Sequence, residues 1–385
     1  MSEIILPKFM NIGAGKVNSI SDILKKINCK YPLIITDKTM VKLNVIEPLE
    51  KTLTEMQIRY EVFDDTVPEP TAKSIENGVN ILKNGNFDSI IAFGGGSPID
   101  SAKAISVLAT KGGAIEDYKF PYINLENEIP LIAIPTTAGT GSEVTKFTII
   151  TNEKTDEKML CVGPAFMPTA AIIDYELTYS VPKRTTADTA IDSLTHAIEA
   201  YVSKKSNSFS DTQAISAMQL IAPNIRKAYD NGKDKEAREK LMIGATLAGI
   251  AFSNSSVALV HGMSRPIGAF YHVPHGLSNA MLLPTVTEFS ITGAPQRYSK
   301  CAKAIGVANF KDNIEDSNKK LLNELKQLNT DLEVPTLEEF GVEKDAFFQN
   351  IDTMAIQAIG SGSPNNNPVV PNHKDLVSLY KKLWD

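Results

Sequence analysis

The sequence predicts two domains of different class, an α/β domain with a parallel sheet followed by an all-helical domain. Its 385 residues suit two domains at roughly 150 residues each. Up to about residue 180, short β-rich runs alternate with helical stretches, whereas such runs almost vanish after Thr185. We therefore expect a boundary after Val181, which gives domains of residues 1–181 and 182–385.

The first domain is expected to hold parallel strands joined by helices. Amphipathic stretches at Thr71–Asn84 and Pro98–Thr110 predict two of these helices. Alternation of strand and helix indicates parallel pairing with the helices as crossovers. Runs rich in aliphatic and β-branched residues predict the strands at Pro32–Thr36, Tyr60–Phe63, Ser89–Phe93, Leu131–Pro135, Phe147–Thr151 and Ala170–Asp174.

The second domain is expected to be helical throughout. Glycine and proline are expected at its joints, because both residues interrupt helices. A long irregular loop, Gly360–Pro371, precedes a last helix at Lys374–Trp384. The other clear helical stretches are Ala190–Val202, Ser210–Tyr229, Lys235–Ser253 and Asn318–Leu328, and the expected joints are at Gly232, Pro266, Pro274, Pro284 and Pro335.

Composition excludes several functional classes. Thirty-nine Lys and Arg against 45 Asp and Glu give a net charge of −6, which argues against nucleic-acid binding because phosphates need a basic surface. No apolar stretch reaches the roughly 18 residues that span a bilayer, and the N-terminus shows no secretory signal. The three cysteines form no CxxC pair, which fits a reducing cytoplasm and argues against disulfides or a thiolate metal site.

A glycine turn follows the strand expected at Ser89–Phe93. Glycines let the backbone turn sharply and let a ligand approach closely. We expect Ser97 to be the N-cap of the next helix, Pro98 its first residue and Asp100 the acid of a capping box. The open helix end suits the pyrophosphate of a dinucleotide. The spacing is not GxGxxG, and a tight turn without a ligand is the alternative.

Two further turns after expected strands carry polar groups. The segment 135–145, PTTAGTGSEVT, offers hydroxyl and main-chain donors suited to phosphate and ribose, with a plain loop as the alternative. Asp37 ends another strand, where an acid can bind the adenosine ribose and repel a 2′-phosphate. Asp37 therefore favours NAD over NADP, and the alternative is a helix cap.

Four of the five histidines lie in two short windows. Asp192 and His196 are four residues apart on a helical pattern and therefore share one face. An ordinary Asp–His hydrogen bond is the simplest interpretation of that pair alone. His261 and His275 lie fourteen residues apart with turn residues between them. Together the four could surround Fe²⁺ or Zn²⁺ with one oxygen and three nitrogens and leave one position open.

Four motifs in this order resemble the iron-containing (group III) alcohol dehydrogenase family over nearly the whole chain. They read GGGSPIDSAK, PTTAGTGSEVT, DSLTHAIEAY and HGMSRPIGAFYHVPHG. That family includes lactaldehyde reductase, 1,3-propanediol dehydrogenase and butanol dehydrogenases. The resemblance implies the dehydroquinate synthase-like fold: a Rossmann-like domain that binds the dinucleotide, a helical domain that binds the metal, and a cleft between them. It also implies a homodimer or larger homo-oligomer.

The resemblance further implies the cofactors and their residues. Asp192, His196, His261 and His275 would be the ligands of Fe²⁺, with Zn²⁺ as the alternative. The residues implied to hold NAD(H) are Asp37, Gly95, Gly96, Ser97, Thr136, Thr137, Thr140, Lys158 and Leu177.

One position departs from the pattern of the family. Several alcohol-oxidising members have a second histidine four residues after the third ligand, whereas this chain has Arg265. A guanidinium there favours a carboxylate, sulfonate or phosphonate tail, so an anionic aldehyde such as a semialdehyde or sulfoacetaldehyde is the expected substrate. The alternative for Arg265 is an ion pair with a nearby acid. His272 is expected to pass a proton, with a structural hydrogen bond as its alternative.

The predicted reaction is reversible hydride transfer between a short primary alcohol or diol and NAD. Three other functions could use the same two-domain fold or only its cofactor and metal sites. Glycerol dehydrogenase and dehydroquinate synthase also use NAD and a metal, but a synthase pocket needs several basic residues, and only Arg265 lies near the histidines. The third alternative is a scaffold without turnover, for which an open metal site has little use.

Overall fold

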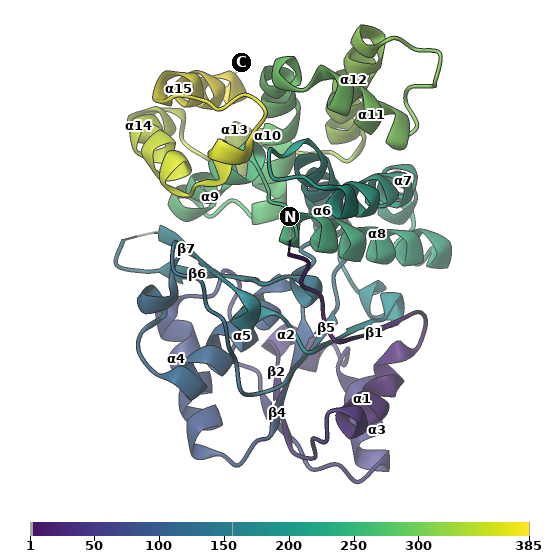
Figure 1. Cartoon of the computed structure of the whole chain (residues 1–385), viewed down its shortest axis with the longest axis vertical. Helices are drawn as coiled ribbons and strands as arrows, with labels where there is room; N and C mark the ends of the chain where they lie inside the picture. Colours follow the sequence, from purple (N-terminus) through teal and green to yellow (C-terminus); the bar gives the residue numbers. More distant parts are fainter. Residues whose placement is uncertain (1–2, 156, 385) are drawn as a thin grey trace. The chain divides into compact units, whose positions relative to one another are not determined.

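The computed structural model describes residues 3–155 and 157–384. The chain divides into two compact units, Ile4–Val181 and the segment from Pro182 onward, here called the sheet unit and the helical unit (Figure 1). All described strands belong to the sheet unit, and the described elements of the helical unit are helices. The expected fold class, an α/β part followed by an all-helical part, is confirmed.

Parallel strands form the main sheet of the sheet unit. Its described strands have the order β1-β8-β5-β4-β2-β3, and each neighbouring pair is parallel. β2, β4 and β5 are adjacent, so their carboxyl ends meet at one edge, where ligands bind in open α/β sheets. The strands are β1 (Phe9–Ile12), β2 (Pro32–Ile35), β3 (Glu61–Phe63), β4 (Ser89–Gly94), β5 (Leu131–Pro135) and β8 (Ala170–Ile173).

Two hydrophobic cores form because alternate side chains of a strand point to opposite faces. On β4, Ile90 belongs to one buried cluster and Ile91 to the other. Burial of both faces explains why these strands read as continuous apolar runs. The cluster with Ile90 includes side chains of α4 (Ala72–Asn84) and α5 (Gly96–Lys111), and the cluster with Ile91 includes those of α1 (Ile20–Lys26) and α3 (Glu47–Glu55).

A separate hairpin corrects one strand prediction. The strand expected at Phe147–Thr151 exists as β6 (Phe147–Asn152), but it pairs antiparallel with β7 (Glu157–Val162) and lies outside the parallel sheet. β7 begins too soon after β6 for the dozen or so residues that a parallel crossover needs. β7 and the short edge strand β1 are not among the strands predicted from the sequence.

Long helices build the helical unit, and two of them continue through expected joints. Pro266 lies inside α9 and Pro284 inside α10, so the prediction that these prolines mark joints is wrong. Both prolines are buried, and the packing around them outweighs the lost main-chain hydrogen bond. The helices are α6 (Lys183–Val202), α7 (Ser208–Asp230), α8 (Lys235–Ser253), α9 (Leu259–Tyr271), α10 (His275–Ser290), α11 (Pro295–Ala304), α12 (Ile314–Asp331), α13 (Leu337–Phe340), α14 (Lys344–Gly360) and α15 (His373–Lys381).

Short helices complete the connections in both units. Within the described residues, no helix combines the length and the apolar character that crossing a membrane requires. The short elements are α2 (Lys38–Lys42) and the 3₁₀ helices η1 (Lys16–Ser19), η2 (Ile115–Tyr118), η3 (Ser142–Val144), η4 (Pro164–Phe166), η5 (Tyr175–Thr178), η6 (Ile291–Gly293), η7 (Ser363–Asn366) and η8 (Lys382–Trp384).

Candidate metal centre and cofactor turns

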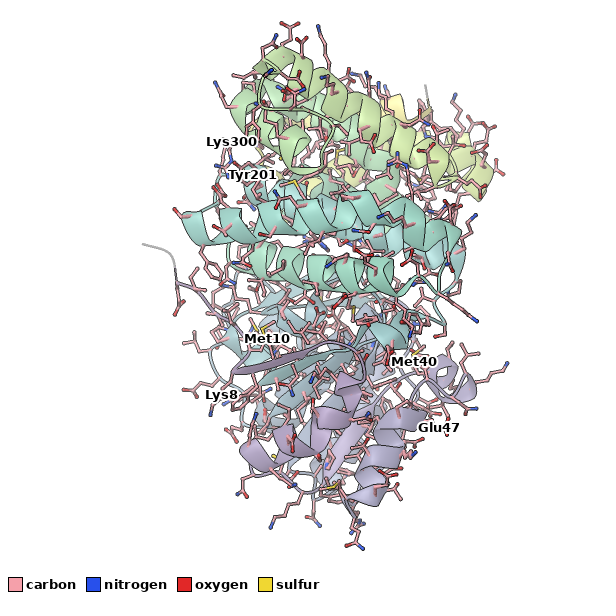
Figure 2. All side chains as sticks on the ribbon, turned by 90° about the vertical axis from the view of Figure 1, so that its right-hand side faces the viewer. Lys8, Met10, Met40, Glu47, Tyr201 and Lys300 are labelled. Carbon is pink, nitrogen blue, oxygen red and sulfur yellow. The ribbon has the colours of Figure 1, made fainter. Side chains whose placement is uncertain are left out.

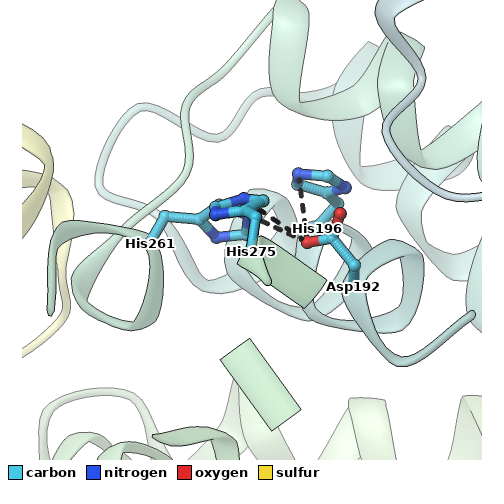
Figure 3. A group of neighbouring side chains, drawn as sticks. All are labelled: Asp192, His196, His261 and His275. Carbon is cyan, nitrogen blue, oxygen red and sulfur yellow. Dashed lines mark ion pairs between the residues drawn. The ribbon is translucent and has the colours of Figure 1, made fainter. Parts of the chain in front are cut away.

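Four expected ligands converge inside the helical unit (Figure 3). Asp192 and His196 lie one turn apart on α6, His261 is in the first turn of α9, and His275 is the first residue of α10. The Oδ1 atom of Asp192 lies 3.4 Å from Nε2 of His261. It lies 3.8 Å from Nε2 of both His196 and His275. The structure thus brings together the acid and the three imidazoles that the sequence separates.

The spacing of these atoms fits a divalent cation. One ligand atom from each residue lies within 4.8 Å of the others. Ligands about 2.0–2.2 Å from a tetrahedral ion stand roughly 3.3–3.6 Å apart, close to the 3.4 and 3.8 Å that separate Oδ1 of Asp192 from the three Nε2 atoms. One oxygen with three imidazole nitrogens suits Fe²⁺ or Zn²⁺.

The electrostatics of this cluster also favour a cation. Burial alone would raise the pKa of the Asp192 carboxyl, but the three imidazoles hold that pKa well below its usual range. Burial alone would lower the pKa of His261, but Glu199 and Asp192 raise it to about 9. The surroundings of His261 therefore stabilise positive charge.

The amide of Asn279 tests whether the site fits a metal. Its Nδ2 lies 2.7 Å from Oδ1 of Asp192 and 3.2 Å from Nε2 of both His261 and His275. Asn279 is fully buried, and its Oδ1 has no hydrogen-bond partner among the described residues. When the two imidazoles are neutral with Nε2 unprotonated, three acceptors converge on this one amide nitrogen. A divalent cation would satisfy these acceptors much better, so the residues present fit the implied metal.

Arg265 lies one helical turn after His261 on α9. Its side chain is half-buried and forms no ion pair or hydrogen bond with the described residues of the helical unit, so the expected alternative, an ion pair with a nearby acid, is not found there. Burial, partly offset by the charge of Glu199, lowers the pKa of Arg265 to about 10, which leaves it positively charged at neutral pH. An unpaired, half-buried guanidinium is suited to bind an anion.

His272 occupies the C-cap of α9 and has a left-handed backbone with φ of 54°. Its side chain is exposed and makes no hydrogen bond to the described residues, so the structural alternative for His272 finds no support. Its role as a proton carrier stays a prediction.

The turn after β4 corrects the predicted helix cap. α5 begins at Gly96 with Gly95 as its N-cap, and no side chain caps it. Ser97 instead accepts a hydrogen bond of 3.3 Å from the main-chain N–H of Glu69, and Asp100 accepts one from Ser142. The tight glycine turn starts the helix before Ser97 can cap it. The helix end therefore keeps open N–H groups, as an anion site requires.

The turn after β5 packs directly against this helix end. The N–H of Thr136 donates a hydrogen bond of 2.9 Å to the carbonyl oxygen of Gly94. Its hydroxyl reaches the sulfur of Met40, which is labelled in Figure 2, at 3.5 Å. A Cβ on Gly96 would lie only 2.8 Å from Cγ2 of Thr140, so a larger residue there would force the Thr140 side chain to move. The turns after β2, β4 and β5 thus meet at one edge.

The remaining expected cofactor residues lie in varied surroundings. Asp37 caps α2, as its alternative predicted, through Oδ1 to the N–H groups of Thr39 and Met40 at 2.8 and 3.0 Å. Nζ of Lys158 lies 2.5 Å from Oε2 of Glu69, the residue that also bonds Ser97. Leu177 is buried in the core cluster that contains Ile91.

Two residues of the centre escaped the sequence analysis. Glu199 bonds Nδ1 of His261 at 2.7 Å, and Asn279 lies among the ligands as described above. Helical spacing was the available signal, because Glu199 follows Asp192 by seven residues and Asn279 follows His275 by four.

Comparisons with known proteins agree with this geometry. Residues 7–175 match the model described as iron-containing alcohol dehydrogenase, and residues 186–384 match the C-terminal model of the Fe-containing alcohol dehydrogenase family. The lactaldehyde reductase of Escherichia coli K12 is 33% identical, with 100% of each chain covered. The structure of a 1,3-propanediol oxidoreductase has a TM-score of 0.94 at 30% identity, again with 100% of each chain covered. The sulfoacetaldehyde reductase of Bifidobacterium kashiwanohense, solved with NAD⁺, has a TM-score of 0.88 at 28% identity and covers 100% of this chain and 98% of its own.

The fold, the cluster of one aspartate and three histidines, and the similarity to known proteins together define a class, the metal-dependent oxidoreductases of alcohols and aldehydes. Within it, the chain belongs to the iron-containing alcohol dehydrogenase family. The expected family, its enzymatic activity class and its cofactors, NAD(H) and iron, are thereby confirmed.

Proposed function

We propose that this enzyme reduces a short aldehyde with an anionic tail, using NADH, and oxidises the corresponding alcohol in reverse. The observation that carries the choice of substrate is the half-buried guanidinium of Arg265, which has no partner among the described residues of its unit and lies one turn from His261. The sulfoacetaldehyde reductase among the similar structures supports this choice, because its named substrate carries an anionic sulfonate.

In this proposal the helical unit holds Fe²⁺ through Asp192, His196, His261 and His275, with Zn²⁺ as the alternative. When bound, the ion acts as a Lewis acid that polarises the carbonyl group of the substrate. Arg265 binds the anionic tail and thereby orients the aldehyde. His272, exposed at the end of α9, passes the proton between the substrate oxygen and water.

The sheet unit holds the dinucleotide in this proposal. The open N-terminus of α5 receives the pyrophosphate at Gly95, Gly96 and Ser97. Asp37 uses only Oδ1 to cap α2, so its Oδ2 serves the adenosine ribose and disfavours a 2′-phosphate. The other expected contacts are Thr136, Thr137, Thr140, Lys158 and Leu177.

Cellular location and assembly complete the proposal. We place the enzyme in the cytoplasm, since Cys29, Cys161 and Cys301 are all buried and unpaired, as a reducing compartment permits. We propose a homodimer or a larger homo-oligomer, which light scattering after size-exclusion chromatography measures directly.

The test compares matched aldehydes. Protein purified without oxygen and loaded with Fe²⁺ is mixed with NADH and either succinic semialdehyde or butanal, which have equal chain length. We expect turnover of both with a higher kcat/KM for the anion. A preference for butanal would return Arg265 to a structural role while keeping the dehydrogenase. No turnover of either, with metal and NADH bound, would favour the synthase-like or scaffold alternatives.

A further inference from the structure

Glu199 is a buried acid that the ligand set does not use. It lies on α6, the helix that carries Asp192 and His196, and its side chain is 4% exposed. A buried carboxylate is costly unless it is fully hydrogen-bonded. Glu199 therefore needs partners, and all of those found belong to α9 or to the residue before it.

Its two oxygens accept three hydrogen bonds. Oε1 accepts the N–H of Val260 at 2.6 Å, and Oε2 accepts the N–H of Ala258 at 2.8 Å. Ala258 is the N-cap of α9 and has no side chain able to cap it. Glu199 thus supplies a negatively charged cap, which satisfies open N–H groups and suits the positive end of the helix.

The third bond fixes the state of a ligand. Nδ1 of His261 lies 2.7 Å from Oε2 of Glu199. Both oxygens of Glu199 already accept main-chain N–H groups, so we take Glu199 as the acceptor of this bond and Nδ1 as its donor. In a neutral imidazole Nε2 then keeps its lone pair. Nε2 is the atom that faces Oδ1 of Asp192.

Asp192 on its own would favour the opposite tautomer. Without a carboxylate beside Nδ1, His261 could carry its proton on Nε2 instead. This N–H group could then donate a hydrogen bond to Oδ1 of Asp192, 3.4 Å away, and Nε2 would have no lone pair left for the metal. Glu199 prevents this arrangement. Direct coordination by Glu199 is disfavoured, because three N–H groups already engage both of its oxygens.

We propose that Glu199 is a positioning residue of the metal centre, which caps α9 and holds His261 as the Nδ1–H tautomer so that Nε2 is free to bind the cation. This inference rests on the metal site of the proposed function. Loss of such a hydrogen-bond partner typically costs about 10–100-fold in metal affinity.

The test measures metal affinity rather than turnover. Co²⁺ is titrated into metal-free wild type, E199Q, E199D and the control E324Q, followed by visible absorption. E324Q removes an ion pair of the same unit, Glu324 with Arg226 at 2.7 Å, away from the ligands. We expect the Kd to rise about 10–100-fold in E199Q, less in E199D, which keeps the charge, and not at all in E324Q. A lower melting temperature in E199Q with an unchanged Kd would overturn the proposal.

Nitrogen-15 NMR of zinc-loaded, histidine-labelled wild type is the second measurement, and it needs no variant that might misfold. We expect His261 to be protonated at Nδ1 and to bind zinc through Nε2. Zinc at Nδ1 would overturn the role of Glu199. Failure of wild type to bind either metal would overturn the proposed metal site together with this inference, whereas equal binding by wild type and E199Q would overturn this inference alone.

Discussion

Nζ of Lys103 donates a hydrogen bond of 2.9 Å to the carbonyl oxygen of Thr145 inside the sheet unit. It donates others to the hydroxyl of Thr145 at 3.2 Å and to the carbonyl oxygen of Phe147 at 2.7 Å. One turn earlier on α5, Asp100 accepts bonds from the hydroxyl of Ser142 at 2.6 Å and the N–H of Ile149 at 2.8 Å. These contacts attach α5, the helix that begins at the glycine turn, to the end of the turn after β5 (residues 135–145) and to the start of β6.

Replacement of Lys103 by Met should therefore weaken cofactor binding. The substitution keeps most of the side-chain volume but removes all three hydrogen bonds, so the two turns lose their fixed spacing. We expect the KM for NADH to rise roughly tenfold, equivalent to about 1.4 kcal/mol, with a smaller change in kcat. Steady-state kinetics at saturating aldehyde provide the measurement. An unchanged KM for NADH would mean that the bonds serve folding alone.

Lys103 should also make stability depend on pH. Burial, only partly offset by Asp100 and Glu143, lowers its pKa from 10.5 to about 8. Between about pH 8 and 10.5 the unfolded chain therefore keeps a proton that the folded protein has released. Stability rises with pH wherever the unfolded state binds more protons, so wild type should gain up to about 3 kcal/mol over that range relative to K103M. Urea unfolding of both proteins at several pH values measures the free energy of unfolding of wild type minus that of K103M. This difference should rise with pH, and a fall would contradict the lowered pKa of Lys103.

Removal of the Arg265 guanidinium should change substrate preference. We expect R265A to lose about 10–100-fold in kcat/KM for succinic semialdehyde, the range of a lost charge-assisted hydrogen bond, and to change little with butanal. R59A, which removes a highly exposed arginine of the sheet unit, is the matched control. Equal losses for both aldehydes would show that Arg265 does not recognise the charge.

The cysteines should resist thiol reagents while the protein is folded. Burial raises the pKa of Cys161 and of Cys301 to about 12, and it raises that of Cys29. The thiolate is the reactive form, so little of it exists at pH 8. We expect Ellman's reagent to label none of the three thiols before unfolding and all three in urea. Rapid labelling of folded protein would contradict the buried positions.

Two neighbouring glycines should respond differently to alanine. A Cβ at Gly96 would lie 2.8 Å from Cγ2 of Thr140, whereas a Cβ at Gly95 would make an ordinary contact of 3.5 Å with Thr137. Overpacking costs about 1–3 kcal/mol, so G96A should lower the melting temperature of cofactor-free protein. G95A should melt close to wild type, and both should raise the KM for NADH by crowding the ligand. Similar melting temperatures for both variants would contradict the packing described for this turn.

Sequence reasoning reached the metal centre only in part. Helical periodicity places Asp192 beside His196, because residues four apart share a face. No local rule could bring His261 and His275 to the same point, and the family resemblance supplied that step. Glu199 was missed because a glutamate on a helix usually faces solvent, and only the fold shows that it is buried against α9.

The limits in the sheet unit have a different physical cause. Long apolar runs such as Leu131–Pro135 identify strands well, since both faces of the sheet are buried. Pairing partners depend on contacts that local patterns do not specify, so the run that forms β6 is predicted as a strand of the parallel sheet, whereas it pairs antiparallel with β7. Likewise, Ser97 has the chemistry of a helix cap, but the preceding glycines start the helix earlier.

The four proposed ligand residues come from three helices and span the chain from Asp192 to His275. An ion bound to all four residues acts as a reversible cross-link, because it closes the segment between them into a loop. Loop closure lowers the conformational entropy of a partly unfolded chain that still holds the ion. Folding of the helical unit and occupancy of its centre are then two aspects of one equilibrium. Removal of the ion is then expected to lower the stability of the helical unit as well as the activity of the enzyme.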